Sequence, residues 1–204
     1  MTKAIIAPIR ASGAGQVSAQ TGSVDDFAKA EGGALAVEPS HTRVLFVVSH
    51  FGFTNYYGEF SGVSGALDFD PKNPSASKLE IQIPVASIGT TSAELNDELK
   101  GEEWFDAVKY PNILFKATKV TMTGPGKADV VGDLTMHGTT KPVVLQAVFH
   151  GAGVNPLNKH YTVGFDASAK IKRTEFGVST YVPLVSDDVD IIISAAFERQ
   201  SEEL

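Results

Sequence analysis

The sequence predicts an all-β fold: an extended, eight-stranded antiparallel barrel with a short helical insert that covers one side or end. Apolar and polar residues alternate along about eight segments, which is the period of half-buried strands. Short segments rich in Gly, Pro, Asn and Asp separate them, as in hairpins. The interruption at residues 85–113 is long enough for a helix. About eight strands is near the number that closes a barrel around one small ligand.

The first 33 residues are predicted to form a flexible arm. Residues 11–21 are small and polar, which is the composition of a flexible linker. Ser23 and Asp26 have the spacing of a helix N-cap with an acid three residues later, and Gly32 and Gly33 would end that helix after one or two turns. Residues 34–204 are predicted to form a single barrel domain, since a chain of 204 residues can bury one core.

The clearest strand covers residues 43–50 and is apolar on both faces. Its even-numbered residues, which end at His50, share one face, and Leu45 and Val47 lie on the other. This pattern indicates an inner face against a core or cavity and an outer face covered by something else. The outer residues Leu45 and Val47 would suit a homodimer contact. The remaining strands are predicted at 59–69 (with a turn or bulge at 62–65), 78–85, 113–115, 132–136, 143–149, 163–171 and 189–197.

The long interruption at residues 85–113 is predicted to contain the helical insert. Thr91 and Glu94 have the spacing of a capping box, and Gly101 suits the C-terminal stop. Leu95 and Leu99 lie four residues apart on one helical face. The insert continues through an aromatic turn before Pro111 returns the chain to a strand. We therefore expect an apolar lid over the barrel.

Composition excludes several classes of function. The chain has 17 Lys and Arg against 24 Asp and Glu, a formal net charge of −7, and no basic run, which argues against a nucleic-acid partner. It has no Cys, so disulfides and thiolate sites are excluded. No apolar run approaches the roughly 20 residues of a transmembrane helix. Residues 1–10 lack the apolar core of a signal peptide, so the protein stays in the cytoplasm or the sequence is a processed form.

Five motifs then occur in a recognisable order. They are HTRVLFVVSH at 41–50, GEF at 58–60, ELKGEEWFD at 98–106 with Tyr110 and Pro111, GDLTMHG at 132–138 with Lys141 and Pro142, and Lys172-Arg173 with Phe176-Gly177. In this order they resemble the YceI-like family over residues 34–199. The resemblance implies an extended lipocalin-like barrel whose long pocket holds a polyisoprenoid or similar amphiphile. It also implies export to the periplasm, and dimers in several members. Glu98 stands where the family often has His, and Trp104 where Phe is usual.

The histidines and hydroxyl residues do not form a recognisable catalytic or metal motif. His41 and His50 are nine residues apart, and His150 and His160 are ten apart, unlike a helical or hairpin metal site. No nucleophile elbow or phosphate-binding loop is present. We therefore predict no catalytic residues, no metal and no cofactor. An enzyme that uses His50 or His137 in the same cavity remains the alternative, and a solid-core interaction domain is a third reading.

The leading hypothesis is non-enzymatic binding, carriage or sequestration of a long-chain isoprenoid or quinone-like lipid in the barrel cavity. The only partners expected are this apolar ligand and a possible second copy of the chain. Polar residues Asn55, Tyr56, Arg173 and Thr174 are predicted near the mouth, where they would meet the head group. The predicted pocket lining is Phe46, Val48, His50, Phe60, Leu67, Phe69, Leu79, Ile81, Ile83, Leu99, Trp104, Phe105, Phe115, Leu134, Met136, Phe149, Phe165 and Ile171.

Overall fold

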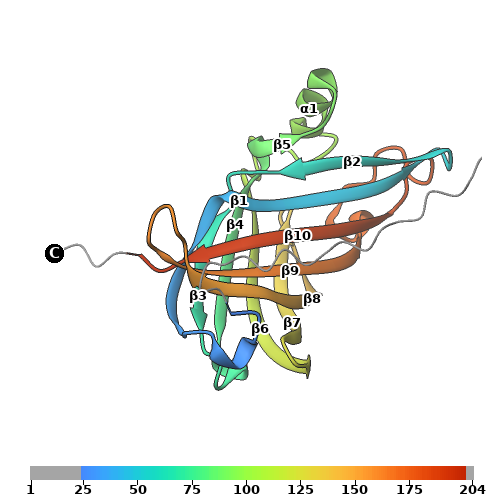
Figure 1. Ribbon diagram of the computed structural model, residues 1–204. Helices are drawn as coiled ribbons and strands as arrows, with labels where there is room; N and C mark the ends of the chain where they lie inside the picture. The colour runs from blue at the N-terminus through green and yellow to red at the C-terminus, as the bar shows by residue number, and fades with distance from the viewer. Residues whose placement is uncertain (1–23, 201–204) are drawn as a thin grey trace, which may run out of the picture.

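The computed structural model describes residues 24–200, and in these residues ten strands form one antiparallel sheet (Figure 1). Eight of them close into a barrel because β1 pairs with β3 on one side and with β10 on the other. The predicted all-β barrel is therefore confirmed. The strands are β1 (Gly33–His50), β2 (Thr54–Phe60), β3 (Ser64–Phe69), β4 (Lys78–Pro84), β5 (Ile88–Gly89), β6 (Asn112–Gly124), β7 (Lys127–Met136), β8 (Thr139–Val154), β9 (Tyr161–Lys172) and β10 (Asp188–Glu198).

Several strands are longer than predicted, β1, β6, β7 and β8 most clearly, and the structure differs from the prediction in two further respects. The single strand predicted at 59–69 is two strands, β2 and β3, because the chain breaks at Gly62, which adopts a left-handed φ of 65°. A second long connection, residues 173–187, was not predicted. It begins with the 3-10 helix η4 (Arg173–Phe176) and joins β9 to β10 beside the end of β1. Further 3-10 turns are η2 (Pro74–Ala76) and η3 (Val85–Ser87).

The helical insert is present as α1 (Ala93–Lys100), which stands above the barrel end near β2 and β5 (Figure 1). Its N-cap is Ser92 and not Thr91, since the Ser92 hydroxyl accepts a hydrogen bond from the Leu95 amide at 3.2 Å. Gly101 is the C-cap, as predicted. No helix within residues 24–200 has both the length and the apolar character needed to cross a bilayer.

The described part of the N-terminal arm packs on the barrel. Asp26 caps the short 3-10 helix η1 (Phe27–Lys29), which ends before Gly32. The ring of Phe27 makes edge-to-face contacts with Phe69 and Phe149, at centroid distances of 5.6 and 5.5 Å. Residues 24–33 therefore belong to the barrel end, while Ser23 and residues 11–21 lie outside the described residues.

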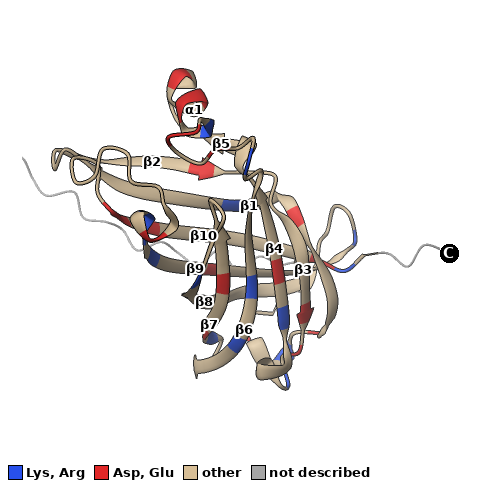
Figure 2. Cartoon of the chain, turned by 180° about the vertical axis from the view of Figure 1, so that it is seen from behind, with Lys and Arg blue, Asp and Glu red and all other residues tan. Residues whose placement is uncertain are grey.

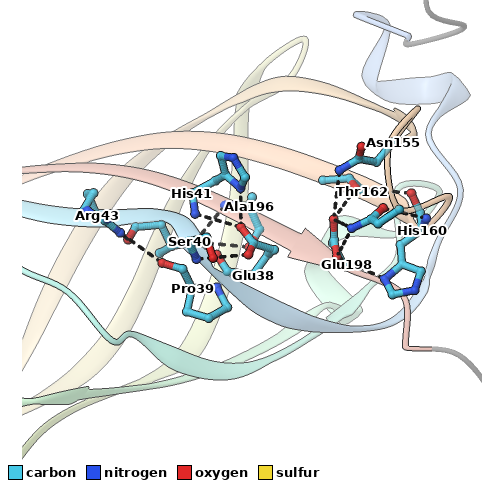
Figure 3. A network of polar contacts seen from close by, with 12 residues as sticks. Glu38, Pro39, Ser40, His41, Arg43, Asn155, His160, Thr162, Ala196 and Glu198 are labelled. Carbon is cyan, nitrogen blue, oxygen red and sulfur yellow. Dashed lines mark hydrogen bonds and ion pairs between the residues drawn. The ribbon is translucent and has the colours of Figure 1, made fainter.

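Strand β1 changes partner along its length because of an irregularity between Glu38 and Arg43. The Glu38 carboxylate accepts hydrogen bonds from the Ser40 and His41 amides at 3.1 and 2.8 Å, and its Oε2 lies 2.6 Å from His41 Nδ1 (Figure 3). Burial acts to raise the pKa of Glu38, but these hydrogen bonds outweigh it and hold the pKa below its usual range. The bulge lets the first half of β1 pair with β3 and the second half with β2.

Close by on the paired strand, Glu198 anchors the end of β10 (Figure 3). Its carboxylate accepts hydrogen bonds from Asn158 at 3.0 and 3.1 Å, from Thr162 at 3.0 Å and from Asn155 at 3.4 Å, and it lies 3.2 Å from His160 Nδ1. Burial acts to raise the pKa of Glu198, yet these hydrogen bonds lower it below its usual value. The turn between β8 and β9 is thereby tied to the last residue of β10.

Candidate functional site

The interior of the barrel contains two adjoining cavities of about 230 and 320 Å³. We call the first the inner cavity and the second, below α1, the outer cavity. Phe60, Met136, Ile171 and Ile191 line both. Because the same four side chains form walls of both cavities, the two lie end to end along the barrel axis.

The inner cavity exists because the inward positions of the strands are apolar but vary in size. Period-2 alternation turns these positions into the barrel, and several of them are alanines that leave volume unfilled. Phe165, Ile193 and Ala195 point inward yet retain accessible surface, as expected for side chains that face a hollow. The alanines of the wall are Ala128, Ala147, Ala167, Ala169 and Ala195.

Aromatic rings cluster at the far end of the inner cavity. Phe165 is at the centre of this cluster, with edge-to-face contacts to Phe69, Phe149 and Phe197 at 5.7, 5.8 and 6.2 Å between centroids. Phe27 from η1 contacts two of the same rings. The inner cavity thus has an aromatic floor at the end away from α1.

The outer cavity is formed where three segments meet: the end of β1 with β2, the helical insert, and the connection 173–187. The insert is positioned by the edge-to-face contact of Phe105 with Phe60, at 5.6 Å. Trp104 Nε1 donates a hydrogen bond to Glu98 Oε1 at 3.1 Å, which places the Glu98 carboxylate in the cavity lining. The outer cavity therefore has a carboxylate in its lining, which the inner cavity lacks.

Arg173 lines the outer cavity, and its guanidinium is bonded to three backbone carbonyls. It donates hydrogen bonds to the carbonyls of Ser186, Val185 and Val178 at 2.9, 2.8 and 3.2 Å. Burial lowers the pKa of Arg173, and the nearby Asp187 carboxylate acts in the opposite direction. Arg173 therefore organises the connection 173–187 with three of its five N–H donors.

The two histidines considered for catalysis lie in different surroundings. His50 lines the outer cavity, where its ring lies 4.2 Å from the Phe51 centroid and 6.2 Å from that of Tyr56. His137 Nδ1 lies 3.2 Å from the Phe176 carbonyl oxygen, and His137 is not a lining residue of either cavity. Within residues 24–200 there is no cluster of three His, Asp or Glu side chains that could hold a metal ion.

All the residues predicted to line the pocket lie on the walls of these cavities. Of the four predicted mouth residues, Tyr56 and Arg173 line the outer cavity, whereas Asn55 and Thr174 line neither. The inner cavity takes Phe60, Leu67, Phe69, Leu79, Ile81, Ile83, Phe115, Leu134, Met136, Phe149, Phe165 and Ile171. The outer cavity takes Phe46, Val48, His50, Phe60, Leu99, Trp104, Phe105, Met136 and Ile171.

Sequence reasoning missed the contribution of the connection 173–187. Val178, Tyr181 and Val185 line the outer cavity, although they belong to no regular element. It also missed the role of the small residues of β9 and β10. Their alternation predicts that they face inward, but their small size, which leaves room for the inner cavity, was not considered. The apolar run in 178–185 between two strands was the available signal.

Comparison with known proteins agrees with this architecture. The profile of the YceI-like domain matches residues 35–197. The chain belongs to the YceI-like family. Protein YceI of Escherichia coli O157:H7 is 38% identical over 163 residues, covering 80% of this chain and 84% of that protein. A UPF0312 protein of Pseudomonas savastanoi is 37% identical over 157 residues, covering 77% and 81%.

Solved structures share the fold of this YceI-like chain. BcnA of Burkholderia cenocepacia superposes with a TM-score of 0.71 at 27% identity, covering 78% of this chain and 98% of that one. The YceI protein of Campylobacter jejuni gives 0.67 at 31% identity, covering 74% and 90%. A polyisoprenoid binding domain from Saccharophagus degradans gives 0.63 at 14% identity, covering 83% and 100%, so this likeness concerns the fold alone.

Proposed function

We propose that this YceI-like protein binds and carries a long isoprenoid-type lipid without converting it, with the tail in the inner cavity and the head group in the outer one. The observation that carries the proposal is the pair of adjoining cavities: an apolar inner cavity with an aromatic floor, and an outer cavity whose lining includes His50, Tyr56 and Glu98. The polyisoprenoid binding domain of Saccharophagus degradans has the same fold, which is consistent with a lipid-binding barrel.

Apolar burial alone is enough for useful affinity. Burying a methylene contributes about 0.8 kcal/mol, so an isoprene unit of roughly five carbons contributes on the order of 3 kcal/mol. A few units offset the roughly 4–15 kcal/mol cost of association. A chain-like apolar ligand therefore needs no dense set of polar contacts to bind in the inner cavity.

The outer cavity favours an uncharged head group. The guanidinium of Arg173 is engaged by three carbonyls, and Glu98 contributes a carboxylate to the lining. A diphosphate would be repelled by this carboxylate, and three of the five N–H donors of Arg173 are already bonded to carbonyls. A quinone or alcohol head group could instead exchange hydrogen bonds with His50, Tyr56 or Glu98.

The direct test is to extract the purified protein with organic solvent and identify the extract by mass spectrometry. The stripped protein is then offered a polyprenyl quinone, and the bound amount is measured. Repeated preparations that contain no isoprenoid and do not take up the quinone would contradict the proposal. The same outcome would leave an enzyme acting on a different ligand, or an interaction domain, as the better readings.

A matched pair of variants locates the tail. Ala169 lines the inner cavity beside its strand partner Ile191, and Ile191 lines both cavities, so Ala169→Phe should block the junction between the two cavities. Ser168→Phe adds the same ring at the adjacent exposed position of β9 and should leave uptake unchanged. Phe46→Asp, which puts a charge on the outer-cavity wall, should also abolish uptake. Uptake by Ala169→Phe at the level of the unmodified protein would place the ligand elsewhere.

A further inference from the structure

Large apolar side chains are exposed around the entrance of the outer cavity. Phe51 and Phe53, at the turn between β1 and β2, are 46% and 87% exposed, and Tyr181 and Leu184, in the connection 173–187, are 58% and 57% exposed. We call these four residues the apolar rim. Exposed apolar side chains are ordinary when scattered, but a contiguous group beside a cavity marks an interaction site.

The apolar rim is one ridge, because its two segments are hydrogen-bonded to each other. The Phe51 amide donates to the Leu184 carbonyl at 2.7 Å, and the Ser186 amide donates to the Ser49 carbonyl at 2.9 Å. His50 and Val185 form an antiparallel bridge between these bonds. In Figure 1 the tip of β1 and β2 and the connection before β10 lie together at one end of the barrel.

The rim continues directly into the outer cavity. Phe51 and Tyr181 are exposed to solvent and also line that cavity. An apolar molecule that leaves a surface in contact with the rim therefore meets apolar side chains of the rim that are themselves part of the cavity wall. Because the rim and the cavity are continuous, the rim is better placed to load a ligand into the cavity than to serve a contact unrelated to the cavity.

Charge identifies the kind of surface that fits the rim. Residues 51–58 and 178–186 contain no charged side chain. The neighbouring insert, residues 93–109, contains six carboxylates (Glu94, Asp97, Glu98, Glu102, Glu103 and Asp106) and two lysines (Lys100 and Lys109), and α1 is correspondingly red in Figure 2. An anionic surface would be repelled by this insert, and no basic patch on the rim would attract one. A surface without net charge and with an apolar interior matches both the uncharged rim and the acidic insert beside it.

We propose that the apolar rim docks onto a zwitterionic lipid surface, so that the lipid enters the outer cavity directly from the bilayer. The proposal rests on the proposed function for the identity of the cargo, but the docking itself is measured independently. The aromatic rings of Phe51, Phe53 and Tyr181 would lie at the headgroup level, with Leu184 beside them.

The first experiment measures binding to phosphatidylcholine vesicles by flotation. The double variant Phe53→Ser, Leu184→Ser, which we call the rim variant, should reduce the bound fraction at least about tenfold. Each substitution removes an apolar side chain that would be buried in the bilayer on docking. Leu157→Ser is the matched control: Leu157 is 91% exposed in the turn between β8 and β9, at the other end of β9 and β10. It should float like the unmodified protein. Adding phosphatidylglycerol should weaken binding.

The second experiment separates docking from lipid binding. The rim variant should take up a polyprenyl quinone from detergent micelles as the unmodified protein does, but at least about tenfold more slowly from vesicles. If the unmodified protein takes up no quinone from either source, the proposed function fails while flotation still decides the docking.

Other results would overturn the docking proposal. These are failure of the unmodified protein to float, equal flotation of the rim variant, or equal uptake from vesicles by the rim variant. A dimer of the unmodified protein that the rim variant converts to monomers, measured by sedimentation, would assign the rim to a second copy of this chain instead of a bilayer.

Discussion

The guanidinium carbon of Arg173 lies 5.5 Å from the centre of the Trp104 ring. This cation–π contact joins two segments that are far apart in the sequence, the helical insert after β5 and the connection between β9 and β10. Thr180 adds a second link, because its hydroxyl donates a hydrogen bond to the Glu103 carbonyl at 2.5 Å. Two of the three segments that form the outer cavity are therefore held to each other as well as to the barrel.

Removing the Arg173 guanidinium should destabilise the fold strongly. Arg173→Met leaves three carbonyls without their charged donor, and we expect a loss of about 3 kcal/mol or more in the free energy of unfolding, measured by urea denaturation. The neighbouring Lys172→Ala removes the ion pairs of a half-exposed lysine with Asp188 and Asp187, at 2.7 and 3.8 Å, and should change the midpoint little. Similar midpoints for the two variants would mean that the carbonyls find other donors.

Trp104 should report ligand binding through its fluorescence. It is the only Trp of the chain and lines the outer cavity, so a head group that displaces water from this cavity should shift its emission to shorter wavelength. Titration of the stripped protein with a polyprenyl quinone measures the shift. Ala169→Phe, which blocks the tail, should abolish it. Unchanged emission in protein shown by mass spectrometry to be loaded would place the head group away from the insert.

Two glycines that make room for aromatic rings should differ in their tolerance of Ala. A Cβ at Gly132 would lie 2.3 Å from the Phe115 ring and 2.7 Å from the Lys116 carbonyl oxygen, so the backbone itself must move. At Gly58 the nearest atoms, 2.1–2.8 Å away, all belong to the Phe46 ring, which can turn toward the outer cavity. We expect Gly132→Ala to cost about 1–3 kcal/mol.

Gly58→Ala should cost less stability than Gly132→Ala but should reduce quinone uptake, because the displaced Phe46 ring would occupy the outer cavity. Thermal unfolding and the uptake assay together separate the two effects. A larger loss of stability in Gly58→Ala than in Gly132→Ala would show that the Phe46 ring cannot move.

The contribution of Glu198 to stability should depend on pH. Because the folded-state pKa of Glu198 is lowered, its contribution is fully present above the ordinary glutamate pKa of about 4.3 and is lost as pH falls through the lowered value. Glu198→Gln should thus be less stable than the unmodified protein at pH 7, and the difference should shrink in acid. Urea unfolding at several pH values tests this. A difference that stays constant down to the acid range would contradict the assignment.

The sequence predicts the strands well because each inward face is marked by period-2 alternation, and the same alternation places the pocket residues on the walls of the cavities. Phe46, Val48 and His50 share the inner face of β1 as predicted. The insert is also predictable, since Gly101 and the leucines of α1 are local signals. These features depend on residues close together in the chain.

The parts that could not be predicted depend on contacts distant in sequence. Arg173 was expected near the head group, but its three carbonyl partners lie in residues 178–186, whose conformation has no periodic signal. The volume of the cavities depends on how alanines of β7, β8, β9 and β10 face one another across the barrel. The pairing of the strands determines which alanines face one another, whereas the pattern of residues within a single strand does not show it.

The pairing of β1 with β10 also limits the width of any molecule that the barrel could hold. A sheet with free edges can part to admit a thicker molecule, but a ring of paired strands widens only by breaking a ladder of hydrogen bonds. The circumference of the barrel is therefore fixed. We expect stripped protein to take up slender chains in preference to bulky molecules such as fused-ring sterols, which a competition uptake assay would measure.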